Sequence, residues 1–544
     1  MVYMHFASRL AGIAAAGFLV WLSLPSGPWP WLPFVSLTPF ALTLRNTGPV
    51  GGLFWGWAGG ALIWLMSTSW VFNSFQHLMG WSVVLSVAGT LLFALVQGLP
   101  YAIFGLVCGV LQSRGRPVGP LFQAALLTLL VFILPAPCPG SPALSLYSLP
   151  LAIQIADLGG FALVNFFFIL INWLLADVLT WMRRPRKCIP GLIAAGLVLA
   201  ACLGYGGLRL NHFQMLEQHA SRDKFLTVRS IQPDIPVVGA VGKKLDDPYK
   251  GVLGIMQMLT ETTASDFAPA DLVLWPEVSR GIYCNCDFFE DHGMNRTTRL
   301  ANAPIVLACL ENPRLRSPEA EKEQGPDQPG SSARKHRQFT VYNTLMLINA
   351  SQCRIIYRKH KLVPFGEAAP LREKWPWLYS KMAKQMEYVP GPGPKVFSLP
   401  GGPEVQPLIC FESGFPKMTR TGAAMGAQAF INVSNDAWFM SARAAEQHLA
   451  LALFRAVEQR RPLVRNTNTG FGAHIKASGE IVPGSLTPMN KRAVRQAALY
   501  LPNETTIYQS TGNSWLWLAV VFVLIRIGQG HRLWLSQKNQ NVSH

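Results

Sequence analysis

The sequence predicts a two-part chain: a multi-pass α-helical membrane domain of about eight spans, and a soluble α/β domain. Half of the 544 residues are hydrophobic and only 14% are charged, which is too apolar for one ordinary soluble domain. The apolar residues gather in long runs before residue 208 and after residue 514, whereas short strand-like runs fill the interval.

Seven spans are predicted in the first part of the chain and an eighth near its end. A hydrocarbon core of about 30 Å requires roughly 20 apolar residues in a helix. Runs that approach or exceed this length lie near residues 8–24, 31–44, 50–70, 81–111, 119–134, 158–182, 189–208 and 514–527. The second run is short, and Gly98 and Pro100 are expected to break the fourth. We assign residues 1–212 to seven helices, 213–513 to the soluble domain, and 514–544 to the eighth helix and a tail.

Basic residues in the short loops predict the orientation. They occur at Arg45, in the loops 113–117 and 183–187, and in the tail around 531–538. Counting spans from a cytoplasmic N-terminus puts all four in the cytoplasm and the soluble domain outside. The net charge of +18 fits these anchors and a basic face near anionic lipid, and no motif indicates nucleic acid.

Glycines recur at Gly52, Gly56 and Gly60 in the third predicted span. Their spacing of four places them on one helix face, where the missing side chains let another helix approach closely. Helix packing explains this pattern better than a ligand site.

The soluble domain is predicted to contain buried strands covered by helices. Apolar or β-branched runs occur at 225–231, 271–275, 304–308, 344–348, 354–357, 406–411, 429–433 and 463–465. Near-continuous apolar strands are typical of a sheet buried on both faces. Residues 444–460 predict a helix, because Leu449, Leu453 and Val457 recur every four positions. Residues 311–338 are polar and rich in Pro and Gly, which predicts a surface insertion.

Three reactive residues, Glu277, Lys359 and Cys410, close or follow three of these strand-like runs. Strand ends are rigid and the loops after them are open, so reactive groups are often displayed there. A carboxylate can take the proton of a thiol, and an ammonium can stabilise the thiolate and an oxyanion. Spacing alone is weak support, because a Glu, a Lys and a Cys occur together by chance in many proteins.

The flanking residues are more specific. They are Trp-Pro-Glu at 275–277, Lys-x-x-Leu-Val-Pro-Phe-Gly-Glu at 359–367, Ile-Cys-Phe-Glu at 409–412 and Ser-Asn-Asp-Ala-Trp-Phe at 434–439. They resemble the nitrilase superfamily and, within it, the apolipoprotein N-acyltransferase family. The resemblance covers nearly the whole chain, because that family places its carbon-nitrogen hydrolase domain after seven spans and before an eighth. It implies a nitrilase-like αββα sandwich for the soluble domain.

The resemblance also implies a ping-pong acyl transfer at the bacterial inner membrane, catalysed on the periplasmic side. Glu277 would be the general base, and Lys359 would support the transition-state charge. Cys410 would take an acyl chain from a phospholipid, typically phosphatidylethanolamine, as a thioester. The acyl group would pass to the amine of the diacylglyceryl cysteine of an apolipoprotein. We expect no metal or cofactor, a monomer, and a hydrophobic cleft between the helices and the soluble domain.

Four further residues are candidates for supporting or substrate-binding roles. Glu367 and Glu412 match family carboxylates that support the site, with a structural salt bridge as the alternative. Asn435 and Trp438 lie in the loop after the next strand. Trp438 is a candidate for the lipid entrance, and a core or interfacial aromatic is the alternative.

The sequence departs from the family at three places. Phe411 stands where a Tyr commonly follows the nucleophile, Lys361 stands where a His is frequent, and residues 237–244 lack the Trp often found in a lid. These changes bear on donor selectivity and lid closure and leave the reaction class unaffected.

Six cysteines are predicted to lie outside the spans, in the oxidising periplasm: Cys138, Cys284, Cys286, Cys309, Cys353 and Cys410. Cys284 and Cys286 form a Cys-x-Cys after Glu277. The sequence offers no further metal ligands at a useful spacing, which leaves a disulfide or two free thiols. Cys410 must stay reduced to react.

Two other functions fit parts of the pattern. A membrane-tethered amidase of the nitrilase type would use the same three residues with water as acceptor, although a soluble substrate needs no spans. A catalytically inactive lipoprotein-binding protein would retain only the fold, although all three reactive residues are present. A pocket open toward the headgroup plane argues against the first alternative, and thioester formation argues against the second.

Overall fold

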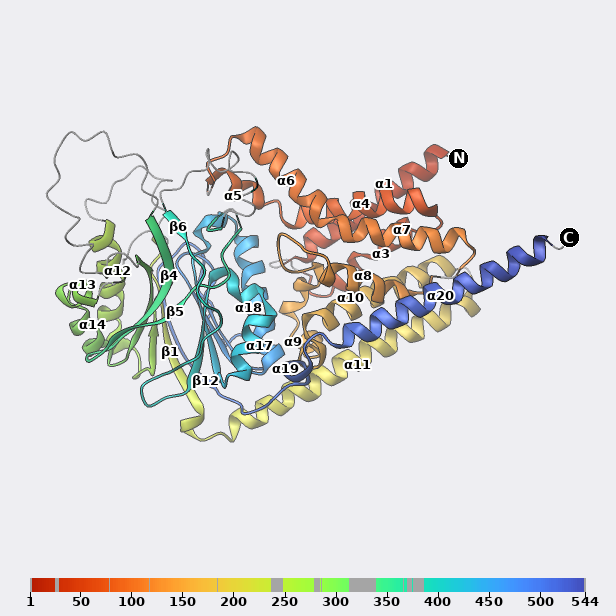
Figure 1. Ribbon diagram of the computed structural model, residues 1–544. Helices are drawn as coiled ribbons and strands as arrows, with labels where there is room; N and C mark the ends of the chain where they lie inside the picture. Colours follow the sequence, from red (N-terminus) through yellow and green to blue (C-terminus); the bar gives the residue numbers. More distant parts are fainter. Residues whose placement is uncertain are drawn as a thin grey trace.

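The computed structural model describes residues 2–24, 29–77, 79–116, 118–182, 184–235, 248–277, 284, 286–312, 339–364, 366–368, 374 and 386–542. A bundle of helices packs against an α/β sandwich (Figure 1). Both ends of the chain lie at the end of the bundle that is remote from the sandwich.

All eight predicted apolar runs are helical in the bundle. The long helices are α1 (Val2–Ser23), α4 (Gly48–Ser67), α10 (Ala156–Trp181), α11 (Pro185–Gln218) and the pair α6 (Val83–Gln97) and α7 (Leu99–Ser113). The pair is bent by 40° at Gly98, where the sequence predicted a break. Three shorter apolar stretches cover Pro33–Thr43, Pro120–Ile133 and Trp515–Gly528. By length and composition, the described helices therefore supply four spans, or five with the bent pair, and the other three of the predicted eight are shorter.

Helices α4 and α7 pack backbone to backbone. A Cβ on Gly52 would lie 2.1 Å from the carbonyl oxygen of Gly105, and a Cβ on Gly56 would lie 2.3 Å from that of Tyr101. A Cβ on Gly60 would lie 2.6 Å from the Tyr101 side chain. Only glycine allows this contact, which confirms the predicted close approach of a second helix.

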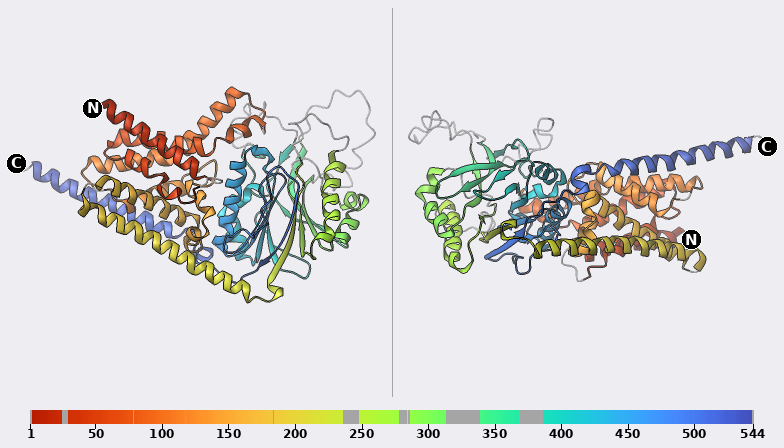
Figure 2. Two further views of the ribbon diagram at one scale, coloured as in Figure 1. Left: turned by 180° about the vertical axis from the view of Figure 1, so that it is seen from behind. Right: turned by 90° about the horizontal axis from the view of Figure 1, so that it is seen from below.

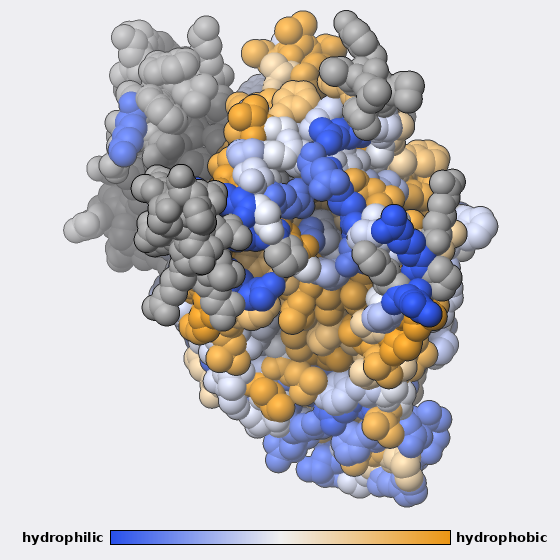
Figure 3. Space-filling model, turned by 90° about the vertical axis from the view of Figure 1, so that its right-hand side faces the viewer, coloured by the Kyte–Doolittle hydropathy of each residue, from blue (hydrophilic) through white to orange (hydrophobic). Residues whose placement is uncertain are grey.

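Basic side chains lie at the end of the bundle that carries the termini. Arg9 donates to the carbonyl of Asn46, Arg45 pairs with Asp177, and Arg116 donates to the carbonyl of Ile527. These contacts bring α1, the loop before α4, the end of α10 and the last helix to one end of the bundle. In a view onto that end, hydrophilic side chains interrupt the hydrophobic surface (Figure 3).

The sandwich consists of two sheets. Their strands are β1 (Phe225–Gln232), β2 (Leu272–Leu274), β3 (Ile305–Glu311), β4 (Phe339–Ile348), β5 (Cys353–Arg358), β6 (Met386–Tyr388), β7 (Phe397–Ser398), β8 (Glu404–Ile409), β9 (Ala429–Ser434), β10 (Leu463–Thr467), β11 (Ala473–Ile475) and β12 (Ala493–Tyr500). The larger sheet has the order β12-β1-β2-β3-β4-β5, with β6 paired to β4, and the smaller sheet has the order β11-β10-β9-β8-β7.

Helices cover both outer faces of the paired sheets. The helices α12 (Pro248–Thr262) and α14 (Met294–Ala301) lie on the larger sheet, and α17 (Pro416–Ala424) and α18 (Ala442–Gln459) lie on the smaller one (Figures 1 and 2). These four layers confirm the predicted αββα sandwich.

Alternating side chains of strand β3 pack into two different hydrophobic cores. In β3, Val306 and Ala308 pack between the sheets, whereas Ile305 and Leu307 pack beneath the outer helices. Both faces of the strand are therefore buried, which explains why its sequence is continuously apolar.

Helix α18 is buried between the smaller sheet and the bundle. Its Phe454 ring lies 4.7 Å from the Phe161 ring of α10, and its Gln447 Nε2 donates to the carbonyl oxygen of Ser67 at 2.8 Å. The helix confirms the prediction made for residues 444–460, and its burial on all sides explains the many apolar residues.

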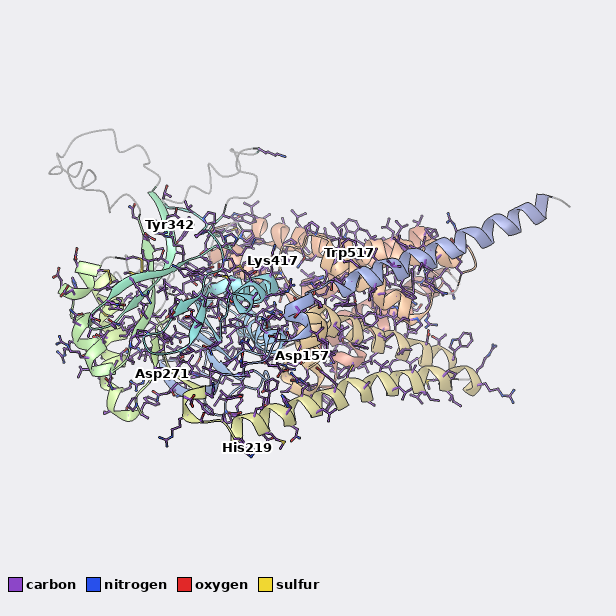
Figure 4. The ribbon with its side chains drawn as sticks, turned by 60° about the horizontal axis from the view of Figure 1, so that its bottom comes forward. Asp157, His219, Asp271, Tyr342, Lys417 and Trp517 are labelled. Carbon is purple, nitrogen blue, oxygen red and sulfur yellow. A yellow bond between two sulfur atoms is a disulfide. The ribbon has the colours of Figure 1, made fainter. Side chains whose placement is uncertain are left out.

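A buried carboxylate joins the two parts of the molecule. Asp157, at the start of α10, lies where the bundle meets the sandwich (Figure 4). It accepts hydrogen bonds from Arg460 Nη2 (2.7 Å), just after α18, and from Arg209 Nε (3.0 Å) and the Tyr205 hydroxyl (2.8 Å) of α11. Buried charges require such partners, so this cluster fixes the sandwich to the bundle.

The chain enters and leaves the sandwich at neighbouring strands. Helix α11 leads into β1, and β12 leads through α19 (Ile507–Thr511) to α20 (Trp515–Val542). Strands β1 and β12 pair antiparallel, with Phe225 opposite Tyr500. The two connections to the bundle therefore lie side by side.

Candidate active site

Glu277, Lys359 and Cys410 meet at one end of the sandwich. Glu277 comes three residues after β2, Lys359 directly follows β5, and Cys410 directly follows β8 of the other sheet. The Lys359 ammonium lies 3.8 Å from Glu277 Oε1, and Cys410 borders the same cavity as both residues. Their exposures are 7%, 1% and 8%, so the three reactive groups are shielded from bulk water.

A second carboxylate and an amide hold the base and the cation in place. Lys359 Nζ donates to Glu367 Oε1 at 2.8 Å, and Asn343 Nδ2 donates to Glu277 Oε1 at 2.7 Å and to Glu367 Oε1 at 3.4 Å. The backbone N–H of Val363 donates to Glu367 Oε2 at 2.9 Å. Glu367 is therefore an ion-pair partner of Lys359, as the salt-bridge alternative for this residue suggested. The sequence predicted no role for Asn343. The residue was recognisable only as a polar residue directly before an apolar run.

Burial and neighbouring charges set the protonation of these groups. Burial by itself would lower the pKa of Lys359, but the Glu367 and Glu277 carboxylates outweigh it and raise this pKa. Burial raises the pKa of the Cys410 thiol to about 12; the Glu277 carboxylate adds to this effect and the Lys359 ammonium opposes it. Burial also raises the pKa of Glu277. The lysine is thus charged and the resting thiol protonated, so attack by Cys410 requires a base.

The backbone at Cys410 is in the left-handed region, with φ of 53°. Few residues other than glycine adopt this conformation, and it is common at sharp strand-to-helix turns that display a nucleophile. The 3-10 helix η5 (Cys410–Gly414) begins here, so the strand ends one residue before the nucleophile, two residues earlier than the predicted run. Three donors hold the Cys410 carbonyl oxygen: Asn432 Nδ2 (3.2 Å), His448 Nε2 (3.0 Å) and Ser413 Oγ (3.2 Å).

Glu412 is fully buried and organises the backbone around the site. Its donors are the Tyr357 hydroxyl (2.6 Å) and the backbone N–H groups of His360 (2.7 Å), Lys361 (3.0 Å) and Ile409 (2.8 Å). Burial raises the pKa of Glu412, and these hydrogen bonds oppose the rise. The carboxyl group ties the segment after Lys359 to the turn that carries Cys410.

A buried charged cluster lies behind the nucleophile. Arg465 Nη2 donates to both carboxylate oxygens of Asp436, at 2.9 and 2.8 Å, and His448 Nδ1 lies 3.1 Å from Asp436 Oδ1. Burial would raise the pKa of Asp436, but Arg465 and His448 lower it to about 2. The sequence predicted no role for His448 or Arg465, although residues 447–449 continue the family resemblance.

A cavity of about 1550 Å³ contains the three reactive residues, and both parts of the molecule form its wall. The bundle contributes mainly apolar and aromatic side chains, among them Trp64, Trp70, Val71, Phe75, Phe93 and Leu144. The sandwich contributes Phe411, Asn435, Trp438 and Phe439 beside the reactive groups. The cavity confirms the predicted hydrophobic cleft between the helices and the soluble domain.

Asn435 and Trp438 belong to one short turn. The Asn435 side chain caps the 3-10 helix η6 (Asp436–Phe439) by accepting from Ala437 N at 3.2 Å, and it also accepts from Asn468 Nδ2 at 3.3 Å. Trp438 borders the cavity, as does Phe411. The turn therefore forms part of the cavity wall, and Asn435 holds its shape.

The segment after Glu277 carries two disulfides. Cys284 pairs with Cys309 of β3, and Cys286 pairs with Cys353 of β5. The Cys-x-Cys pair is thus oxidised, with each cysteine bonded to a different strand of the larger sheet. The Cys410 thiol is free.

Two segments for which the sequence made a prediction lie outside the described residues. These are the lid segment 237–244 and most of the insertion 311–338. Within the described ranges, no group of three or more His, Cys, Asp or Glu side chains is placed to hold a metal ion.

The sequence matches two protein families along most of its length. Residues 227–530, more than half of the chain, match the carbon-nitrogen hydrolase family, and residues 16–174 match the apolipoprotein N-acyltransferase N-terminal domain. An apolipoprotein N-acyltransferase of Azotobacter vinelandii is 30% identical over 89% of this chain and 88% of its own length. The chain belongs to the apolipoprotein N-acyltransferase family.

Other relatives agree with this family. The apolipoprotein N-acyltransferase of Caulobacter vibrioides is 30% identical, and the match covers 64% of this chain and 65% of that relative. A solved amidase structure from Nesterenkonia sp. has a TM-score of 0.34 and 17% identity, covering 53% of this chain and 95% of that one. The match to the Azotobacter vinelandii relative covers 89% of this chain and therefore includes both the helical part and the sandwich.

Proposed function

We propose that the protein transfers an acyl chain from a phospholipid to the N-terminal amine of the diacylglyceryl cysteine of apolipoproteins. The observation that carries this proposal is the shared cavity, in which the Cys410 thiol faces a chamber with walls from membrane-type helices. A soluble amide needs no such wall, whereas an acyl chain can stay in apolar surroundings while its ester reaches the thiol. The family of the chain supports the same reaction class.

In the first half-reaction, Glu277 takes the thiol proton and the Cys410 sulfur attacks the ester carbonyl carbon of the phospholipid. The Lys359 ammonium stabilises the thiolate and the tetrahedral oxyanion. The ester C–O bond then breaks, and Glu277 returns the proton to the departing alkoxide. A lysophospholipid leaves, and a thioester remains on Cys410.

In the second half-reaction, the amine of the lipoprotein cysteine attacks the thioester carbonyl carbon. Glu277 takes a proton from this amine, the C–S bond breaks, and the thiolate of Cys410 regains the proton from Glu277. An amide-linked acyl chain leaves on the lipoprotein. Glu277 serves as the base in both half-reactions, so a monomer suffices. We expect the phospholipid donor to be phosphatidylethanolamine.

We assign the protein to the bacterial inner membrane, with the sandwich on the periplasmic side. The loop residues Arg45 and Arg116 lie at the opposite end of the bundle, as expected for cytoplasmic loops. The two disulfides of the sandwich fit an oxidising compartment.

Mass spectrometry of the purified protein tests this proposal. We expect phospholipid alone to leave an acyl thioester on Cys410, and added diacylated lipopeptide to discharge it with formation of N-acylated peptide. The Cys410→Ser variant should form neither product, whereas Cys138→Ser, which removes another free thiol at the cavity, should retain both. A labelled acyl-enzyme in Cys410→Ser contradicts the proposal, and release of free fatty acid without N-acylated peptide indicates a hydrolase.

A further inference from the structure

We infer that His448 is a positioning residue, which orients the nucleophile through the backbone carbonyl of Cys410. This inference rests on the thioester chemistry proposed above. His448 lies on α18, is 5% exposed and borders the cavity. Its Nε2 lies 3.0 Å from the Cys410 carbonyl oxygen. Because a carbonyl oxygen can only accept a hydrogen bond, Nε2 must carry a proton.

This hydrogen bond is the same in both protonation states of the imidazole. In the neutral ring, Nδ1 accepts from Arg465 Nη2 at 3.0 Å; in the charged ring, Nδ1–H donates to Asp436 Oδ1 at 3.1 Å. Asp436 and Arg465 are the charged residues against the ring, and the Phe439 ring packs edge-on at 5.8 Å. Burial and Arg465 lower the pKa of His448. The ring is therefore mainly neutral at neutral pH, and its support of Cys410 does not depend on that state.

The contacts of the ring also exclude an acid–base role. Nε2 is engaged with the carbonyl oxygen of Cys410, and Nδ1 with Arg465 and Asp436. Both nitrogens are therefore occupied by other partners, whereas burial raises the pKa of the Cys410 thiol and the Glu277 carboxylate, which acts on this thiol, adds to the rise. Proton transfer thus belongs to Glu277, and His448 acts on geometry.

The carbonyl matters because the turn at Cys410 is strained. A φ of 53° persists only where surrounding contacts hold it. His448, Asn432 and Ser413 all donate to this one oxygen, and His448 is the donor supplied by the helix that packs on the bundle. Without that donor, the turn can relax and move the sulfur away from Glu277. A displacement of about 1 Å at a reacting atom can slow a reaction about 100-fold.

Two substitutions at this position separate positioning from packing and from proton transfer. His448→Leu has a similar side-chain volume but no donor, whereas His448→Gln can donate an amide N–H to the carbonyl and cannot exchange a proton. The readout is the rate of thioester formation on Cys410 with phosphatidylethanolamine in mixed detergent micelles, measured from pH 5.5 to 9. We expect His448→Leu to be 10- to 100-fold slower, with an unchanged donor concentration at half-maximal rate and an unchanged pH profile, and His448→Gln to recover most of the rate.

His474 supplies a matched control. It is another buried histidine of the sandwich, and its Nε2 lies 3.0 Å from the carbonyl oxygen of Val228, away from the cavity. His474→Leu should lower the melting temperature yet leave the acylation rate of the folded protein unchanged.

Two outcomes contradict the inference. In the first, His448→Gln forms the thioester as slowly as His448→Leu does. In the second, His448→Gln loses one limb of the pH profile that the wild-type protein shows. A wild-type protein that forms no thioester contradicts the proposed function itself. If His448→Leu does not fold, the rate and pH profile of His448→Gln decide.

Discussion

Buried polar residues at the site fix the relative positions of two loops that follow strands of different sheets. Glu412 accepts from four donors, three of which are backbone N–H groups: two belong to the residues directly after Lys359, and one to the residue directly before Cys410. A carboxylate suits this role, because each of its two oxygens can accept more than one hydrogen bond and neither needs a proton. The residue therefore acts on the site through the backbone.

The Glu412→Gln substitution tests this role. The amide offers one accepting oxygen and replaces the other with an NH₂ group, which must face a backbone N–H. A buried donor left unsatisfied costs about 1–3 kcal/mol, so we expect a lower melting temperature and slower thioester formation. Thermal unfolding in detergent and the acylation assay measure the two effects. Glu404→Gln, in the same strand as Ile409 but partly exposed, should change neither value.

The sequence indicated part of this site but not its supporting residues. The flanking motifs pointed to Glu277, Lys359 and Cys410, and the structure brings these three together. Asn343 gave no comparable signal, and His448 lies in a segment, 447–449, that resembles the family but was given no role. The roles of both residues arise from hydrogen bonds to residues far away in the chain. Asn343 is 66 positions from Glu277, and His448 is 38 positions from Cys410.

At the scale of elements, the sequence predicted those strands whose buried residues form a recognisable run. The runs behind β1, β3, β8 and β9 are largely buried on both faces and were found. Strand β12 was missed, because most of its side chains are only partly buried and its sequence therefore alternates weakly. Strands β6 and β7 have three and two residues, too short for any period to be seen.

The contact between α4 and α7 yields a prediction with a built-in control. In Gly52→Ala, the new methyl group would meet the carbonyl oxygen of Gly105 at 2.1 Å, so the helices must separate. The neighbouring Gly51→Ala places its methyl 3.4 Å from Thr47, the residue directly before the same helix, which is an ordinary contact. We expect Gly52→Ala to lower the melting temperature in detergent by several degrees, consistent with a cost of about 1–3 kcal/mol for overpacking. Gly51→Ala should leave it unchanged or raise it slightly, and equal destabilisation by both would contradict the packing.

At the scale of the whole molecule, the Asp157 cluster holds the sandwich on the bundle. Asp157→Asn leaves the guanidinium of Arg460, which is fully buried, without its negative partner. Breaking a buried pair in this way costs about 3–5 kcal/mol, and we expect a lower melting temperature and easier proteolysis between the two parts. The control is Asp177→Asn at the far end of the bundle. Its pair with Arg45 is partly exposed, so its loss should cost at most about 1 kcal/mol. An Asp157→Asn protein as stable as this control would show that the cluster does not hold the parts together.

The pairing of β1 with β12 makes the sandwich an insert within the helix bundle. Its first and last strands are hydrogen-bonded neighbours, so cutting the chain before Phe225 and after Tyr500 would leave two ends about 5 Å apart. Such an excised fragment would keep all three reactive residues. It would nevertheless lose the helices that line one side of the cavity, and α18 would be left with a bare apolar face. The catalytic residues can therefore be separated from the membrane by two cuts, but the chamber in which they work cannot.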